Sequence, residues 1–316
     1  MARRRRNRGR NVHGVLLLDK PIGITSNAAL QTVKRLFNAN KAGHTGSLDP
    51  LASGMLPICL GEATKLSGFL LSADKSYRAV CKLGVTTSSG DADGEVLETR
   101  PLPELTRDQV QEVLESFMGK IMQTPPMHSA IKQGGVPLYK LAHQGIEVER
   151  AAREVTIFAL QLLRLEGDEL EIAVRCSKGT YIRTLAEDIG AALGCGAHIT
   201  ALRRTSVGAL DDCPLHTMAE LEATLEAEGV AGLDAVLLPM ERALPDWPAV
   251  SLSEDASYYL SQGQAVFVPQ VKDRGWVRLF AGDQRFLGLG TILDDGRVAP
   301  KRLLNTENMV KRPQIG

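Results

Sequence analysis

The sequence predicts a folded α/β protein with a large mixed domain over residues 13–244 and a small β-rich domain over residues 245–316. The chain has 316 residues, more than the ~100–200 of one typical domain. Segments with helical and strand periodicity alternate up to Pro245, and short strands and turns dominate beyond it. Hydrophobic residues make up 44% and charged residues 23%, which are globular proportions and exclude a disordered or fibrous chain.

The sequence predicts a basic arm over residues 1–12. Six arginines stand in the first ten positions, which leaves 31 basic against 37 acidic side chains in the rest of a chain with no net charge. Such an arm suits a nonspecific phosphate contact or a solubilising tail, and the sequence leaves both open. The apolar run Val15–Leu18 is shorter than the ~7 residues of a signal peptide, and no run approaches the ~18 of a membrane span. We therefore expect a cytoplasmic protein.

A helix is expected to begin at Ser26, which suits the N-cap position. Its apolar face would carry Leu30, Val33 and Phe37. The loop that follows, GHTGSLDPLASGMLP over residues 43–57, contains three glycines and two prolines. Its irregular backbone is therefore predicted by its composition.

Two strands and two helices are expected in the middle of the chain. One strand places Tyr77 on the same face as Ala79, Cys81 and Leu83, and a second alternates from Leu170 to Cys176. The residues from Thr106 to Gln109 form a capping box that opens one helix, and the other helix follows Thr180. Between them, residues 119–153 show no period and are expected to be irregular and functional. Two helical stretches are predicted around Leu221 and Val236.

Asp49 stands before Pro50, which disfavours the α region and holds the aspartate extended. The simple interpretation is a turn. Arg183 falls in the first turn of its helix, where the dipole disfavours a cation by about 0.3–1 kcal/mol, so it needs an anion. Asp49 is a candidate, and the charge pair would favour its ionised form. A solvated surface arginine is the alternative.

Five motifs resemble the TruB-type family of tRNA pseudouridine synthases: VLLLDKPIGITSN, AGHTGSLDPLASGMLPICLGEATK, YRAVCKLGVTTSSGDADG, CSKGTYIRTLAEDIG and HITALRRTSVG. They follow the family's order from about Gly14 to Gly208. GHTGSLDP is highly specific, whereas SKGT or LRR alone means little. Ser47 and Ser53 replace the alanine and threonine common in the family, and both stay small.

The resemblance implies a mixed, largely antiparallel central sheet with flanking helices, an RNA cleft, and an isomerase that needs no cofactor. It implies a catalytic group of Asp49, Tyr77 and Arg183. Tyr77 would pack against the uracil and is a candidate to handle a proton, and Arg183 would be the charge partner of Asp49. The implied substrate contacts are His44, which replaces the extruded nucleotide, Tyr181 and Leu202, which line the base pocket, and Lys20 with Pro21, which support the site.

The implied partner is tRNA, modified at uridine 55 of the T-loop by a monomeric enzyme. Residues 119–153 resemble the insertion that grips this loop, with His128, Lys132 and Tyr139 as contacts. The C-terminal domain more weakly resembles a PUA RNA-binding domain, and a structural cap is the alternative. Its phosphate-facing candidates would be Arg297, Lys301 and Arg302.

Several other functions are weighed against this interpretation. Five cysteines without a CxxC pair and six histidines without HxxxH give no metal pattern, and the DADG run has Val96 where a calcium loop needs glycine. Neither of the glycine-rich nucleotide-binding motifs, GxxxxGK[ST] and GxGxxG, occurs between a predicted strand and a predicted helix. A noncatalytic tRNA-folding chaperone, a guide-RNA-dependent synthase and an N-glycosidase that releases uracil remain alternatives.

Overall fold

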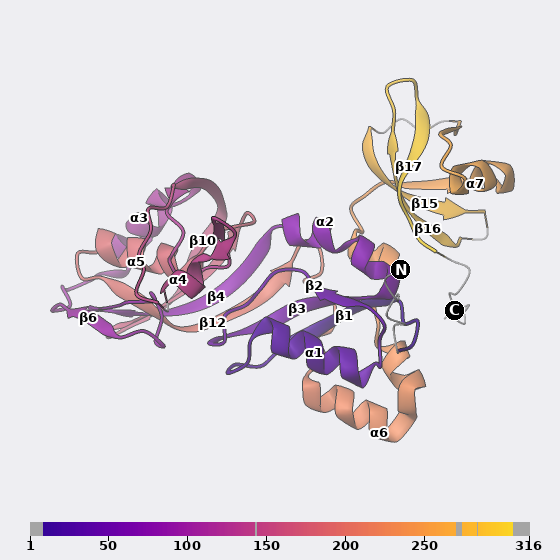
Figure 1. Cartoon of the computed structure of the whole chain (residues 1–316). Coiled ribbons are helices and arrows are strands. Elements are labelled where there is room, and N and C mark those ends of the chain that lie inside the picture. The colour runs from indigo at the N-terminus through magenta and orange to yellow at the C-terminus, as the bar shows by residue number, and fades with distance from the viewer. Residues whose placement is uncertain (1–8, 143, 270–273, 283, 306–316) are drawn as a thin grey trace.

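The computed structural model describes residues 9–142, 144–269, 274–282 and 284–305. One sheet of eight strands forms the body of the molecule, and a separate sheet of five strands lies at one end (Figure 1). The path through the large sheet is β1-β3-β12-β4-β11-β10-β7, and β2 pairs with β3 beside it. Its strands are β1 (Gly14–Lys20), β2 (Ala42–His44), β3 (Ala52–Leu60), β4 (Lys75–Leu83), β7 (Gly119–Gln123), β10 (Arg153–Glu166), β11 (Glu169–Cys176) and β12 (Ala197–Val207).

The large sheet is mixed and mostly antiparallel, which confirms the predicted fold class. Strand β12 runs parallel to β3 on one side and antiparallel to β4 on the other. Leu202 therefore lies opposite Ala52 and Ala79 at once. This long-range insertion of β12 between two earlier strands brings the N-terminal motifs next to the late LRR segment.

Helix α1 (Ser26–Leu36) begins at the predicted residue, but its N-cap differs from the prediction. Its N-cap is Thr25, whose side chain accepts a hydrogen bond from the Ala28 amide. The Ser26 hydroxyl instead accepts from the Leu48 amide at 2.7 Å and donates to the Leu48 carbonyl at 3.0 Å. The expected apolar face packs into the main core, so the N-cap assignment to Ser26 was wrong because a distant loop binds that hydroxyl.

The predicted face of β4 is confirmed. Ala79, Cys81 and Leu83 are buried and Arg78 is exposed, while Tyr77 is half-buried at the start of the run. The second predicted strand is β11, whose Val174 pairs with Tyr77. Tyr77 therefore stands where the buried face of β4 emerges at the surface.

The helices lie at the two ends and along the faces of the large sheet (Figure 1). The capping box of Thr106 and Gln109 is present at the start of α3, and the predicted helix after Thr180 is α5, with Tyr181 as its N-cap. Helix α6 bends at Gly229 and ends before Val236, so the two predicted stretches form one kinked element. Besides α1, the helices outside residues 119–153 and the second sheet are η1 (Gly61–Lys65), α2 (Ser67–Ser72), α3 (Arg107–Ser116), α5 (Ile182–Ala192), α6 (Met218–Ala235) and η2 (Met240–Ala243).

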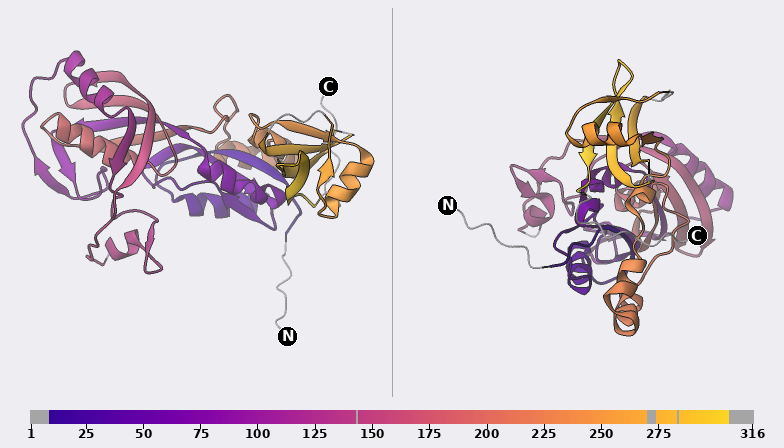
Figure 2. Two further views of the ribbon diagram at one scale, coloured as in Figure 1. Left: turned by 90° about the horizontal axis from the view of Figure 1, so that it is seen from above. Right: turned by 90° about the vertical axis from the view of Figure 1, so that its right-hand side faces the viewer.

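Residues 119–153 are less irregular than predicted. Their first five residues form β7, an edge strand paired with β10. The hydrogen bonds that β10 supplies impose this strand on five residues without alternation of apolar and polar side chains, which explains why periodicity missed it. The rest projects from the body (Figure 2) and contains the two-residue strands β8 (Lys132–Gln133) and β9 (Val136–Pro137) and the short helix α4 (Leu138–Ala142).

The C-terminal sheet joins the body through an aromatic contact. The ring of Trp247 lies 4.8 Å from that of Phe69 on α2 and 5.6 Å from that of Trp276 on the second sheet. Lys65 adds a 2.8 Å hydrogen bond to the Leu303 carbonyl. The elements are β13 (Ala249–Leu252), α7 (Glu254–Ser261), β14 (Val266–Phe267), β15 (Gly275–Ala281), β16 (Phe286–Ile292) and β17 (Arg297–Leu303), and a separate hairpin in the body pairs β5 (Val85–Thr87) with β6 (Val96–Thr99).

Most of the predicted basic arm, residues 1–8, lies outside the described residues. Arg10 is described and is anchored to the body. Its guanidinium donates to both carboxylate oxygens of Asp234, at 3.0 and 2.9 Å, and to the Phe37 carbonyl at 3.2 Å. In the described parts of the chain, no helix has the length and apolar character needed to cross a membrane.

Candidate active site

Asp49 lies in the irregular segment between β2 and β3. Its neighbour Leu48 is buried and fastened to Ser26, whereas the Asp49 side chain is 45% exposed. The Ala52 amide donates to the Asp49 carbonyl at 3.0 Å, and the Gly23 amide donates to the Pro50 carbonyl at 2.8 Å. The backbone is thus held on both sides of the aspartate, and its carboxylate projects from a fixed loop.

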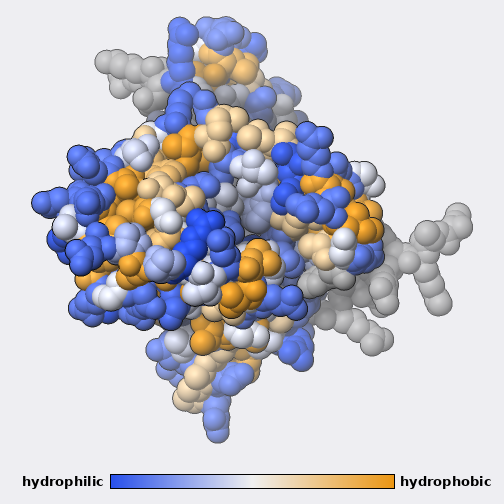
Figure 3. Space-filling view, turned by 90° about the vertical axis from the view of Figure 1, so that its left-hand side faces the viewer, coloured by the Kyte–Doolittle hydropathy of each residue, from blue (hydrophilic) through white to orange (hydrophobic). Residues whose placement is uncertain are grey.

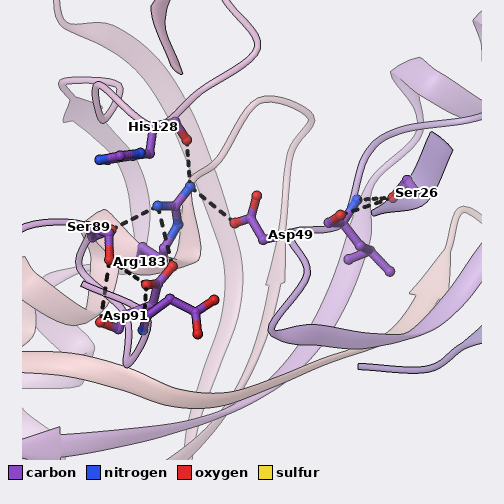
Figure 4. Close-up of polar contacts among 8 residues, drawn as sticks. Ser26, Asp49, Ser89, Asp91, His128 and Arg183 are labelled. Carbon is purple, nitrogen blue, oxygen red and sulfur yellow. Dashed lines mark hydrogen bonds and ion pairs between the residues drawn. The ribbon is translucent and has the colours of Figure 1, made fainter. Parts of the chain in front are cut away.

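The ion pair that the sequence suggested between Arg183 and Asp49 is present, at 3.1 Å. The Arg183 side chain is only 6% exposed. It also lies 3.5 Å from the Asp91 carboxylate and donates to the carbonyls of Ser89 at 2.8 Å and His128 at 2.7 Å. Figure 4 shows the guanidinium between Asp49 on one side and Ser89 and Asp91 on the other. Arg183 is therefore a fixed cation rather than a solvated one.

Asp91 is the member of this network that the sequence analysis missed. It belongs to the DADG run, which ends one of the five family motifs and was tested as a calcium loop, but Asp91 itself was given no role. Its carboxylate accepts hydrogen bonds from the Ser89 hydroxyl and from the Asp93 amide, and it is buried. The available signal was the Asx-turn chemistry of Asp91 two residues before Asp93, but nothing local pointed that carboxylate at Arg183.

The electrostatic environment of Asp49 contains opposing effects. Burial raises the pKa of Asp49 above its usual value, and the nearby Asp91 charge raises it further. The Arg183 guanidinium opposes both and favours the ionised carboxylate. The charge of Asp49 thus depends on the Arg183 contact.

Tyr77 faces the same region from β4. Its phenol is hydrogen-bonded to the guanidinium of Arg204, its partner across the β4–β12 pair. Burial raises the pKa of Tyr77 above its usual value, so the hydroxyl stays protonated at neutral pH. A neutral phenol ring can stack on a base and donate a hydrogen bond, and is a poor proton acceptor.

Tyr181 and Leu202 come from two other elements. Tyr181 is the N-cap of α5, and its backbone is bound by the side chain of Gln123. The Tyr181 N–H donates to Gln123 Oε1 at 2.8 Å, and Gln123 Nε2 donates to the Tyr181 carbonyl at 3.1 Å. Burial raises the pKa of Tyr181. Leu202 is 9% exposed on β12. Gln123, at the end of β7, is thus a positioning side chain that the sequence did not reveal.

His44 and Lys20 are both screened from solvent. His44 lies in β2, and burial followed by the charge of Arg204 lowers its pKa from 6.5, which keeps the ring neutral. Its Nδ1 atom is buried and has no hydrogen-bond partner among the described residues. Lys20 is fully buried and donates to the carbonyls of Pro21 and Ile24, each at 2.8 Å. Burial lowers the pKa of Lys20 to about 8, against the opposing effect of Asp49.

Of the remaining candidates, His128 lies close enough for its charge to oppose the rise that burial causes in the pKa of Asp49, and the others lie away from Asp49. The backbone of His128 reaches the site through its bond to Arg183, whereas Lys132 and Tyr139 lie on the exposed projection. Arg297 on β17 pairs with Asp295 at 2.7 Å, and its neighbours Lys301 and Arg302 are exposed on the second sheet. Two separate surfaces therefore lie away from Asp49. One is the projection with Lys132 and Tyr139, and the other is the second sheet with Arg297, Lys301 and Arg302.

The end of the molecule away from the second sheet presents a mixed surface. Figure 3 shows apolar patches interrupted by hydrophilic residues on this face. Exposed apolar side chains at this end include Leu97, Met122 and Phe158, and Arg175 lies 5.2 Å over the Phe158 ring. The described residues contain no group of three or more histidine, cysteine, aspartate or glutamate side chains placed to hold a metal ion.

Comparisons with known proteins match nearly the whole chain. The family description "TruB family pseudouridylate synthase (N terminal domain)" fits residues 34–182, and two C-terminal TruB descriptions fit residues 183–245 and 248–304. Proteins named tRNA pseudouridine synthase B from Nitrosococcus oceani and Coxiella burnetii strain RSA 493 are 59% and 56% identical. The matches cover 98% and 93% of this chain and 100% and 96% of theirs.

Two solved structures share the fold at lower identity. One is a Cbf5-Nop10-Gar1 complex, with a TM-score of 0.72 and 28% identity over 92% of this chain and 84% of that chain. The other is an H/ACA RNP bound to a substrate RNA containing 2′-deoxyuridine, with a TM-score of 0.71 and 26% identity over 96% of this chain and 92% of that chain. With its fold, its motifs and relatives more than half identical over nearly its full length, the chain belongs to the TruB family of pseudouridylate synthases.

Proposed function

We propose that the protein isomerises uridine to pseudouridine in tRNA, with Asp49 acting at the glycosidic bond. The observation that carries this is the Asp49 carboxylate, half-exposed on a fixed loop and held at 3.1 Å by the buried Arg183. Carboxylates beside a sugar carbon that becomes cation-like perform the same task in glycosidases. Tyr77, Arg183 and Asp49 form the catalytic group in this proposal.

The reaction is balanced without an added reactant. The C1′–N1 bond breaks, the uracil turns while it stays bound, and a C1′–C5 bond forms. C5 loses its proton and N1 gains one, so no electrons are gained or lost overall. A pocket that includes Tyr77, Tyr181 and Leu202 would hold the base during the turn and exclude water that would release it.

A uridine inside a folded loop must first be turned out, at a cost of a few kcal/mol. His44 is placed to offset this cost because its ring is neutral and its buried Nδ1 atom has no partner among the described residues. A neutral imidazole can stack and hydrogen-bond in the gap that the uridine leaves. The buried Lys20 supports the Asp49 site from beneath.

The proposed substrate is the T-loop of tRNA, with position 55 as the target. Relatives that are 53–59% identical carry the name tRNA pseudouridine synthase B, whereas the Cbf5-Nop10-Gar1 complex and the H/ACA RNP match this chain at 28% and 26% identity. The projection within residues 119–153 and the second sheet are the proposed RNA grips, with the arginine arm adding phosphate contacts. A monomer located in the cytoplasm belongs to the same proposal.

The decisive experiment incubates the purified protein with unmodified tRNA transcript in the absence of added cofactors and maps pseudouridine by position. Asp49→Asn is expected to abolish product and leave tRNA binding nearly intact, because the amide keeps the shape but cannot carry the charge. Asp93→Asn, which replaces an exposed carboxylate in the loop that contains Asp91, serves as the control. Turnover by Asp49→Asn would refute the assignment, and free uracil would indicate a glycosidase instead.

A further inference from the structure

Arg204 is a fully buried charged side chain, 1% exposed, on β12. Its recorded partners among the described residues are two backbone carbonyls and the Tyr77 hydroxyl, none of which is a carboxylate. A buried guanidinium carries a desolvation cost that carbonyl partners offset only in part. Such a residue adds little to stability, so its position calls for a different explanation.

The guanidinium connects three separate elements beneath the candidate site. Its Nε atom donates to the Met55 carbonyl on β3 at 2.7 Å, and Nη2 donates to the Gly46 carbonyl at 3.2 Å, three residues before Asp49. The third contact is the phenol of Tyr77, which lies directly opposite Arg204 in the antiparallel β4–β12 pair. Directly opposite residues share one face of a sheet, so the contact follows from the register.

The backbone around Arg204 is built for close approach. Gly54 on β3 is the parallel partner of Arg204 and has φ of +97°, which favours glycine. A Cβ atom added there would lie 2.2 Å from the Arg204 carbonyl oxygen. The glycine therefore lets β3 and β12 approach until the guanidinium reaches the loop that carries Asp49.

We propose that Arg204 is a positioning residue that fixes the Tyr77 ring relative to the Asp49 loop by binding the Tyr77 hydroxyl and the Gly46 carbonyl together. The inference rests on the proposed function, since it assumes that Tyr77 and Asp49 act on the same uridine. Without the guanidinium fork, the ring and the loop would move independently. Binding of the tRNA body, which uses other surfaces, would be preserved.

The test uses Arg204→Lys, which retains the charge and loses the fork. Its single-turnover rate of pseudouridine formation is expected to fall about 100-fold, the effect of a displacement near 1 Å in a catalytic group, while its Kd for tRNA changes less than about threefold. The control is Arg203→Lys, the exposed neighbour that pairs with Asp19, and it should keep the rate and the Kd. A normal rate in Arg204→Lys would overturn the proposal.

A double-mutant cycle with Tyr77→Phe separates positioning from general support of the fold. If Arg204 acts through the hydroxyl, its substitution should cost at least about tenfold less in the Tyr77→Phe background. Independent, multiplying effects would refute the proposal. Should Arg204→Lys fail to fold, Tyr77→Phe keeps the tether testable, because a wild-type rate without the hydroxyl contradicts it.

The activity of the wild-type protein distinguishes failure of the proposed function from failure of the proposed role of Arg204. If the unmodified protein forms no pseudouridine, the proposed function fails and the role of Arg204 fails with it. If the wild type is active and Arg204→Lys is equally active, only the role of Arg204 is lost.

Discussion

At the scale of single residues, the site is organised by cations that differ in their partners. Arg183 faces two carboxylates, Asp49 at 3.1 Å and Asp91 at 3.5 Å, whereas Lys20 and Arg204 are bound by carbonyls. The first arrangement holds a negative charge at the candidate site. In the second arrangement, the charge of Arg204 adds to burial in lowering the pKa of His44. The charge of Lys20 opposes the burial that raises the pKa of Asp49.

The Asp91→Asn variant should reveal the effect of the second carboxylate. The Asp91 charge adds to burial in raising the pKa of Asp49. Since the proposed reaction uses the ionised form, activity is expected to fall as the pH drops through that pKa. Removing the Asp91 charge should lower the Asp49 pKa and move the acid limb of the single-turnover pH profile to lower pH. The plateau rate should fall, because Arg183 loses one of its anchors.

The pH profile of the Asp93→Asn variant is the matched control, since Asp93 is exposed in the same loop and touches Asp91 only through its amide. Its acid limb should coincide with that of the wild type. An acid limb that moves to higher pH in Asp91→Asn would contradict this electrostatic account of Asp49.

At the scale of elements, the start of α1 has two adjacent hydroxyls with different tasks. Thr25 caps the helix, and Ser26 binds both backbone groups of Leu48, next to Asp49. Helix α1 is thereby attached to the loop that presents the carboxylate. The stability of the helix and the geometry of the loop can be separated by experiment.

Ser26→Ala should lower both stability and rate. The change leaves the buried Leu48 amide and carbonyl without this partner, at a cost of about 1–3 kcal/mol, and frees the loop beside Asp49. Thr25→Ala should cost about 1 kcal/mol through loss of the N-cap and leave the rate unchanged. Urea unfolding and single-turnover assays measure the two effects, and an equal loss of rate in both variants would show that Ser26 does not control the loop.

At the scale of the whole molecule, the second sheet is packed onto the body rather than tethered by a linker. Phe69, Trp247 and Trp276 form a continuous aromatic contact, and Phe286, Leu289 and Leu304 from the C-terminal region join a core cluster that also contains Val15 and Leu17 of β1. An apolar contact of this kind fixes the proposed RNA surfaces relative to each other.

Trp247→Ala should uncouple the two parts. Loss of the ring removes the link between α2 and the second sheet, so calorimetry is expected to resolve two unfolding transitions where the wild type shows one. Tyr258→Ala, on exposed α7, should leave the single transition intact. A single transition in both variants would mean that the aromatic contact does not couple the parts.

The sequence by itself determined the elements whose signals are local. The alternation in β4 and β11, the capping box of α3 and the α5 helix follow from short-range periodicity and backbone chemistry. Asp49 was recognisable from its motif, and Arg183 from its unfavourable place near a helix N-terminus. Strand β7 and the true N-cap of α1 escaped prediction because partners far along the chain supply their hydrogen bonds.

Only the tertiary structure decided which charges meet. Asp91 and Arg183 approach because α5 packs beside the β5–β6 turn, and Arg204 reaches Tyr77 because β12 enters between β3 and β4. Alternation along β12 predicts that Arg203 and Arg204 face opposite sides, but an arginine is rarely expected in a core. Burial and pairing depend on the whole path of the backbone, so no local pattern encodes them.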